Sequence, residues 1–126
     1  MKYLLCTHCK NLVEVVEDSN VPIICCGQPM KELDPRACDG ASEKHVPVVT
    51  LNENEVKVAV GSVFHPMSEE HYISWVSIET KKGYQRKMFT RNSEPVLCFT
   101  LEKDDELLRV YAYCNLHGLW VTEEFN

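Results

Sequence analysis

The stretch Val56-Lys57-Val58-Ala59-Val60 decides the fold, because valine stands at every second position. Alternation with a period of two is typical of a β-strand that buries one of its faces. On both sides lie further β-branched and aromatic segments, and turn residues separate them. These further predicted strands cover residues 45–51, 71–78, 84–90, 95–101 and 107–113. About seven short strands with a turn every ten or so residues indicate an antiparallel sandwich or barrel. Helical periodicity is absent over any useful length.

Size and charge narrow the class of protein. A chain of 126 residues can form one ordinary core, or one modest core with a small appendage. Its apolar runs are all shorter than the ~18 residues of a membrane-spanning helix, so we expect no membrane partner. The net charge of −6 leaves no basic stripe, which argues against nucleic acid as a partner.

The first 26 residues hold four of the seven cysteines, namely Cys6, Cys9, Cys25 and Cys26. Short strands are predicted over 12–16 and 21–24 between them. A unit of about 36 residues, taken here as 1–36, is too small to fold on its own apolar core. A metal held by four thiolates would staple it, and the Cys6-x-x-Cys9 spacing suits such a site. The adjacent pair Cys25-Cys26 predicts a distorted tetrahedron. Thiolate chemistry alone leaves zinc and iron open.

The cysteines also bear on the compartment. The apolar stretch after Met1 ends within a few residues, which is too short for the core of a signal peptide. We therefore expect a cytoplasmic chain whose thiols stay reduced. Clustered cysteines then indicate metal binding more than disulfides.

A second group of metal-binding residue types lies in the strand-rich part, residues 37–126. It consists of His45, His65, His71, Cys114 and His117, each at a strand edge or in a loop. His45 is expected to open the first strand of the sandwich. Imidazoles with one thiolate suit iron or copper. A blue-copper site would usually add a methionine soon after the loop histidine, but the last methionine is Met88. Copper is therefore the weaker option.

These residues stand in motifs that closely resemble one family, the two-iron superoxide reductases called desulfoferrodoxins. Cys6-Thr7-His8-Cys9 and Cys25-Cys26-Gly27-Gln28-Pro29-Met30 resemble its desulforedoxin-type N-terminal module. Glu43-Lys44-His45-Val46-Pro47, His65-Pro66-Met67, His71-Tyr72-Ile73 and Tyr113-Cys114-Asn115-Leu116-His117-Gly118 resemble its neelaredoxin-type catalytic domain. The resemblance spans essentially the whole chain. It implies a mostly β protein with an immunoglobulin-like sandwich after the small module, and usually a homodimer.

The resemblance also implies a reaction, the one-electron reduction of superoxide to hydrogen peroxide without dioxygen evolution. One iron would sit on the four N-terminal cysteines. A second, ferrous iron would have four equatorial histidines, an axial Cys114 and an open sixth position. Lys44 would attract the anionic substrate to an acidic protein, and Glu43 would close onto the oxidised iron. The implied electron donor is a rubredoxin or a similar protein.

Two rival functions differ from this one in class. The chain could be an iron electron carrier without turnover, or a zinc-stabilised interaction scaffold. Neither needs an open coordination position beside a lysine, whereas a reductase does.

The remaining chemistry-bearing residues are assigned structural roles. His8 is expected to face solvent as a spectator, and Cys98 to be a small core residue. Core packing is also the expected role of the large aromatic side chains Trp75, Trp120, Tyr111 and Tyr113. Cys38 matches no ligand pattern.

Overall fold

The fold is described by a computed structural model that covers residues 1–36, 40 and 42–125. The chain divides into two compact units, Met1–Asp34 and Pro35–Asn126, which are described in turn. No helix in the described ranges is long and apolar enough to cross a membrane.

The smaller unit consists of short antiparallel strands. Its first sheet has the order β2-β1-β5 and contains β1 (Lys2–Leu5), β2 (Leu12–Val15) and β5 (Lys31–Glu32). A separate hairpin pairs β3 (Ile24–Cys25) with β4 (Gln28–Pro29). Among the residues of this unit only Tyr3, Leu4 and Cys6 are buried, so it has almost no apolar core.

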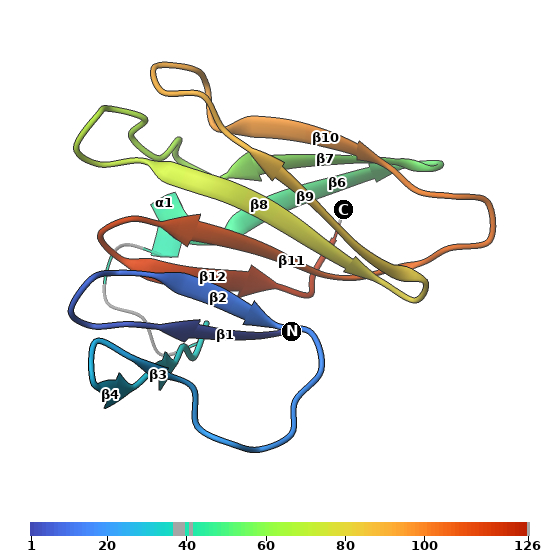
Figure 1. The fold of residues 1–126 in the computed structure, drawn as a ribbon. Helices are drawn as coiled ribbons and strands as arrows, with labels where there is room; N and C mark the ends of the chain where they lie inside the picture. The colour runs from blue at the N-terminus through green and yellow to red at the C-terminus, as the bar shows by residue number, and fades with distance from the viewer. Residues whose placement is uncertain (37–39, 41, 126) are drawn as a thin grey trace. The chain divides into compact units, whose positions relative to one another are not determined.

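The larger unit contains two antiparallel sheets (Figure 1). The first has the order β10-β7-β6, with β6 (Pro47–Asn52), β7 (Glu55–Val60) and β10 (Val96–Thr100). The second has the order β12-β11-β8-β9, with β8 (Ile73–Thr80), β9 (Gly83–Met88), β11 (Leu107–Cys114) and β12 (Gly118–Thr122). A single helical turn, α1 (Ser42–His45), precedes β6. The mostly β, sandwich-like fold is therefore confirmed.

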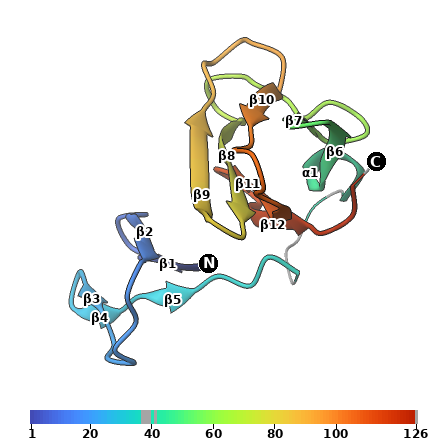
Figure 2. The ribbon, with the colours of Figure 1, turned by 90° about the vertical axis from the view of Figure 1, so that its right-hand side faces the viewer.

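The core lies between the two sheets, as the view along the strands shows (Figure 2). The valines of β7, at 56, 58 and 60, have no exposed surface, and Lys57 between them faces solvent. From the opposite sheet Val76, Ile78 and Val110 are fully buried as well. Burying such side chains stabilises a fold by about 1.5–3 kcal/mol each. The sandwich thus has the apolar core that the smaller unit lacks.

Several local expectations differ from the structure. His45 is the last residue of α1 and not a strand residue, because the extended chain begins only at Pro47. The strand expected over 21–24 is reduced to Ile24 and Cys25, and the strands β1 and β12 were not predicted. Short strands with little alternation carry too weak a periodic signal to be recognised.

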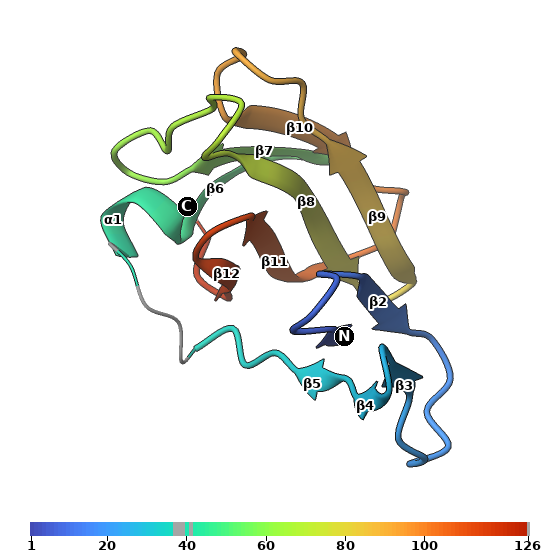
Figure 3. The ribbon, with the colours of Figure 1, turned by 60° about the vertical axis from the view of Figure 1, so that its left-hand side comes forward.

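Three connections gather at one end of the sandwich. They are α1, the loop of residues 61–72 between β7 and β8, and the turn between β11 and β12 (Figures 1 and 3). The register brings the last two together, because Cys114 at the end of β11 pairs with Ile73 at the start of β8. Four of the five predicted ligands of the sandwich lie in these three connections, and the fifth, Cys114, is the last residue of β11.

Candidate metal centres

Four imidazoles and one thiol converge at this end of the sandwich. The potential ligand atoms of His45, His65, His71, Cys114 and His117 all lie within 4.8 Å of one another. His45 and His65 are almost fully buried, Cys114 is fully buried, and the other two are half-buried. The structure thus brings together every residue that the sequence predicted for the second site.

The four imidazole rings form a square. Neighbouring centroids are 4.6 Å apart for His45–His65, 4.6 Å for His65–His71, 5.1 Å for His71–His117 and 4.9 Å for His45–His117. The diagonal between His45 and His71 is longer, at 6.4 Å. His45 therefore stands opposite His71.

The ring nitrogens have the spacing that one metal ion requires. Nε2 of His45 is 3.1 Å from Nε2 of His65 and 3.1 Å from Nδ1 of His117. Two nitrogens about 2.1 Å from one ion and at right angles would be about 3.0 Å apart. Cys114 Sγ lies 3.4 Å from Nε2 of His65 and 3.9 Å from Nδ1 of His117, as expected for a fifth ligand beside the square.

The protonation states of the imidazoles also fit a metal. Burial lowers the pKa of His65 to about 4, and burial is also the largest cause of the lowered pKa of His71. Both rings are therefore neutral near pH 7, which is the form that binds metal. Nδ1 of His65 lies 2.6 Å from the carbonyl oxygen of Pro66; donation of its proton there leaves Nε2 free as a ligand.

One nitrogen gives a direct test of the fit. Nε2 of His71 is buried and has no hydrogen-bond partner among the described residues. Leaving such an atom unpaired is unfavourable, by about 1–3 kcal/mol. A metal ion at the centre of the square would satisfy it, so the residues present fit the iron that the sequence resemblance implies.

The side chain of Cys114 is a neutral thiol when no cation is bound. Burial raises the pKa of Cys114, while the backbone N–H groups of His117 and Leu116 oppose that rise. The His117 N–H lies 3.4 Å from Sγ. A bound cation would displace the thiol proton, because the thiolate is the form that ligates metal.

The turn after β7 fixes α1, which carries Glu43, Lys44 and His45. The carbonyl oxygen of Glu43 accepts hydrogen bonds from the Val63 N–H (3.0 Å) and the Ser62 hydroxyl (3.2 Å). Gly61 packs so closely that an added Cβ would lie 2.6 Å from that oxygen. Only glycine fits there. Lys44 is half-buried, and its charge contributes to the low pKa of His71, so it lies near the square.

One residue at this site was assigned only to core packing. Trp120 is buried, as expected, but its ring also stacks on His45 with centroids 4.7 Å apart. Its indole N–H donates to the carbonyl oxygen of His117 at 3.1 Å. Trp120 therefore contacts two candidate ligands. The only sequence signal was its position three residues after His117, which becomes informative once β12 is recognised.

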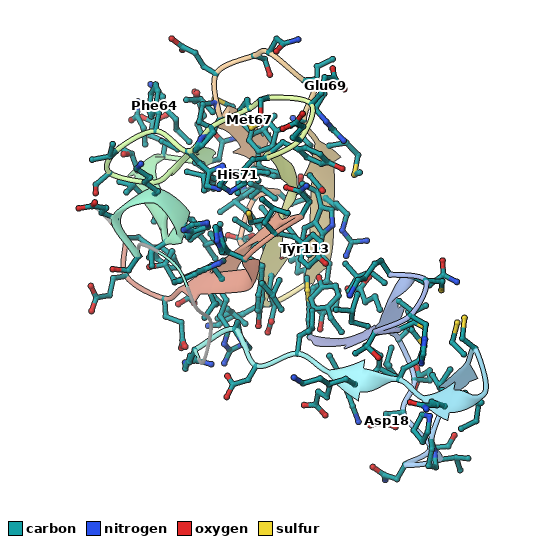
Figure 4. All side chains as sticks on the ribbon, turned by 90° about the vertical axis from the view of Figure 1, so that its left-hand side faces the viewer. Asp18, Phe64, Met67, Glu69, His71 and Tyr113 are labelled. Carbon is teal, nitrogen blue, oxygen red and sulfur yellow. The ribbon has the colours of Figure 1, made fainter. Side chains whose placement is uncertain are left out.

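The loop between β7 and β8 directs some of its side chains into the sandwich and others outward. Figure 4 shows His71 and Met67 toward the inside of the sandwich, whereas Phe64 and Glu69 lie at the outer rim of the loop. The burial of the side chains agrees, since Met67 is 8% exposed and Phe64 is 51% exposed.

Tyr113, next to the ligand Cys114, stacks on Trp75 and not on a histidine.

The second cluster lies in the smaller unit. The sulfur atoms of Cys6, Cys9, Cys25 and Cys26 lie within 4.8 Å of one another, and those of Cys9 and Cys25 are 3.6 Å apart. Sulfurs about 2.3 Å from one tetrahedral ion would be about 3.8 Å apart. The structure again brings together all the residues that were predicted.

A tight hairpin explains how two adjacent cysteines can serve one site. Cys25 pairs with Gln28, which leaves Cys26 and Gly27 as a two-residue turn. Both have positive φ, 52° and 76°, as in a type I′ turn. Cys25 thus ends a strand while Cys26 occupies the turn, so their side chains leave the backbone in different directions.

The knuckle around Cys6 provides backbone donors for sulfur. The Cys9 N–H is 3.5 Å from Cys6 Sγ and lowers the pKa of Cys6 to about 6. The neighbouring thiols of Cys9 and Cys6 raise the pKa of Cys26 to about 12. Four thiols this close cannot all ionise without a cation between them, which favours a metal over a set of free thiols.

Three residues outside the clusters complete the comparison. His8 is exposed, as expected of a spectator. The core role expected for Cys98 is wrong: it is exposed, because Leu97 and Phe99 on either side turn inward and strand alternation directs Cys98 outward. Cys38 lies outside the described residues.

Known proteins are similar to this chain in sequence and in structure. Residues 37–123 match the family model described as Desulfoferrodoxin. A desulfoferrodoxin homolog of Archaeoglobus fulgidus is 44% identical over 95% of this chain and 94% of its own. The desulfoferrodoxin of Nitratidesulfovibrio vulgaris is 42% identical over 94% and 92%. The crystal structure of the superoxide reductase from Treponema pallidum is similar with a TM-score of 0.78 and 39% identity, covering 94% of this chain and 98% of that one. The chain therefore belongs to the desulfoferrodoxin family.

Proposed function

We propose that this chain is a superoxide reductase, converting superoxide to hydrogen peroxide at the His45–His65–His71–His117–Cys114 centre. Superoxide, one electron and two protons give one hydrogen peroxide, with no dioxygen formed. The observation that carries the proposal is the square of imidazoles with a thiol to one side. The relatives named superoxide reductase, including the Treponema pallidum structure, support it.

Iron bound by these five residues would supply the electron and the Lewis acidity that the reaction needs. The chain's own residues supply the rest. Four neutral imidazoles and one thiolate would add only one negative charge to a ferrous ion, so the loaded centre would be net positive and would attract a small anion. The N–H groups directed at Cys114 Sγ moderate the electron donation of the thiolate.

Lys44 has the role of attracting the substrate. The protein carries a net charge of −6, so an anion is repelled by most of its surface. Lys44 is half-buried beside His71 and offers a local positive charge at the site. Such a charge raises the encounter rate of an anion and orders the water through which protons arrive.

Glu43 would supply a carboxylate to the bound iron after turnover. Its side chain is exposed, and its backbone oxygen is fixed by Ser62 and Val63. A carboxylate on so short a helical turn can approach the centre without rearrangement of the sandwich. This keeps Glu43 available without making it a permanent ligand.

The remaining assignments belong to the same proposal. Residues 1–36 form a module with iron on Cys6, Cys9, Cys25 and Cys26, and residues 37–126 form the catalytic domain. Both ligand sets require reduced thiols, which the cytoplasm maintains. A small redox protein such as a rubredoxin returns the electron, and the chain acts as a homodimer.

The test is a pulse of superoxide onto the reduced iron protein, with peroxide and dioxygen measured. A reductase gives one peroxide for each superoxide and no dioxygen. Half a peroxide with matching dioxygen would make the chain a dismutase. Decay no faster than the uncatalysed background would favour an electron carrier or a zinc scaffold.

A further inference from the structure

His71 has the weakest local support of the four histidines. It is half-buried and lies in a loop just before β8, and its Nε2 has no hydrogen-bond partner in the described part of the chain. The loop closes on itself through Ser68, whose N–H and hydroxyl both donate to the His71 carbonyl oxygen at 3.0 and 3.2 Å. These bonds shape the turn, but they do not fix its place relative to Cys114.

Asn115 provides that connection. Its side-chain Oδ1 accepts the Tyr72 N–H at 2.9 Å, and its Nδ2 donates to the Glu70 carbonyl oxygen at 2.8 Å. Its own backbone N–H donates to the Tyr72 carbonyl oxygen at 3.2 Å. One residue therefore binds the backbone on both sides of His71, while its covalent neighbour is Cys114.

The orientation of the amide follows from its partners. A backbone N–H can only donate and a carbonyl oxygen can only accept, so Oδ1 must face Tyr72 and Nδ2 must face Glu70. Both groups belong to one rigid amide plane, so they also fix the separation of the two backbone groups that flank His71. Asparagine offers both a donor and an acceptor at this reach, whereas an ionised aspartate offers acceptors only.

We propose that Asn115 is a positioning residue that clamps the His71 loop to the Cys114 turn and so sets the geometry of the His₄Cys centre. This inference rests on the proposed function, since it assigns Asn115 a role at the metal centre described there. Asn115 does not touch the metal or the substrate. It acts by holding the backbone on both sides of His71 at a constant distance from Cys114 before metal arrives.

The experiment measures metal binding and not turnover. In the iron-loaded protein, chelator competition gives the affinity of the His₄Cys site, and the tetrathiolate site of the same molecule is the internal control. Outer partners of metal ligands typically contribute about 10- to 100-fold in affinity. We expect Asn115→Ala to lose that much at the His₄Cys site and nothing at the Cys₄ site. Its ferric EPR spectrum should change shape as well.

Two further variants keep the test decisive. Asn115→Asp retains the acceptor for Tyr72 but loses the donor to Glu70, so a smaller loss of affinity is expected. Asn54→Ala, in an exposed turn where only its backbone oxygen takes part in a hydrogen bond, should match the unchanged protein. If Asn115→Ala does not fold, the Asp variant carries the same comparison.

Hydrogen exchange of the zinc-substituted protein separates positioning from general stability. Loss of the clamp should expose the Tyr72 amide selectively, with β8 and β11 core amides unchanged. Wild-type affinity and EPR shape in Asn115→Ala would overturn the clamp even if superoxide reduction is verified. If superoxide reduction fails in the unchanged protein, the affinity comparison still decides whether the clamp exists.

Discussion

The two candidate metal centres differ in how deeply their ligands are buried and in how much apolar core surrounds them. In the smaller unit, Cys9 and Cys26 are exposed, and only Tyr3, Leu4 and Cys6 of that unit are buried. In the sandwich, His45, His65 and Cys114 are buried at the end of a continuous apolar core. The first cluster therefore has to hold its unit together, whereas the second is held by a fold that exists without it.

This difference is what the chemistry of each centre requires. A closed tetrathiolate leaves no position for a small molecule and contributes folding free energy directly. A centre meant to react must keep one position open, so other interactions must hold the ligands in place. Trp120 and the turn of Gly61 to Val63 do so for the sandwich centre.

Metal removal should have the largest effect, and it should affect the two units differently. Binding of a structural ion in so small a unit contributes about 10 kcal/mol or more to its folding. We therefore expect the metal-free protein to lose the fold of residues 1–34 and to keep the sandwich. Residue-resolved hydrogen exchange should show fast exchange in β1 and β2 and continued protection in β8 and β11. Equal protection in both units would mean that the cysteines do not determine the fold of the smaller unit.

Ligand variants should separate the two centres functionally. His71→Ala or Cys114→Ala removes a ligand from a preformed square, so superoxide reduction should fall to the uncatalysed background. The tetrathiolate absorption should stay intact, and the melting temperature of the sandwich should change little. Cys9→Ala is the matched variant, for which we expect the opposite pattern. Activity retained in both His71→Ala and Cys114→Ala would count against the ligand assignment.

The sequence predicts the two ligand sets better than the elements that carry them. Alternation at Val56, Val58 and Val60 predicts a buried strand because its period is a direct consequence of strand geometry. The ligands could be predicted because clustered imidazoles and thiols favour a metal site and because the motifs that contain them resemble those of one family. The expectations that His45 lies in a strand and that Cys98 lies in the core were wrong. The structure at each of these positions depends on which face a neighbouring segment presents. Local pattern does not contain that information.

The roles of Trp120 and Asn115 show the same limit. Both act through hydrogen bonds to backbone groups, of His117 in one case and of Glu70 and Tyr72 in the other. Any residue has those backbone groups, so no side-chain pattern marks the partner. Only the pairing of β11 with β8 and β12 brings the groups together.

A Lys44 variant tests whether a local positive charge attracts a small anion to the sandwich centre. Lys44→Ala should slow the capture of superoxide by about tenfold at low ionic strength. The difference should shrink as salt rises, because salt screens the attraction. Lys103→Ala makes the same change in net charge in an exposed turn between β10 and β11, and should leave the rate nearly unchanged. Stopped-flow rates over a series of salt concentrations measure both; equal, salt-independent rates would remove Lys44 from the mechanism.

Trp120→Phe should have the smallest effect. It tests how far the fold of the sandwich positions the metal ligands before metal binds. Phenylalanine keeps a ring to stack on His45 but lacks the N–H that donates to the His117 carbonyl oxygen. A single hydrogen bond of this kind contributes about 1 kcal/mol, so we expect a loss of about 2- to 10-fold in metal affinity at the His₄Cys site. The Cys₄ site should be unaffected, since Trp120 belongs to the sandwich. Chelator competition on the same sample reads both sites. A loss of equal size at the two sites would mean that Trp120 acts on the whole chain and not on the turn that carries His117.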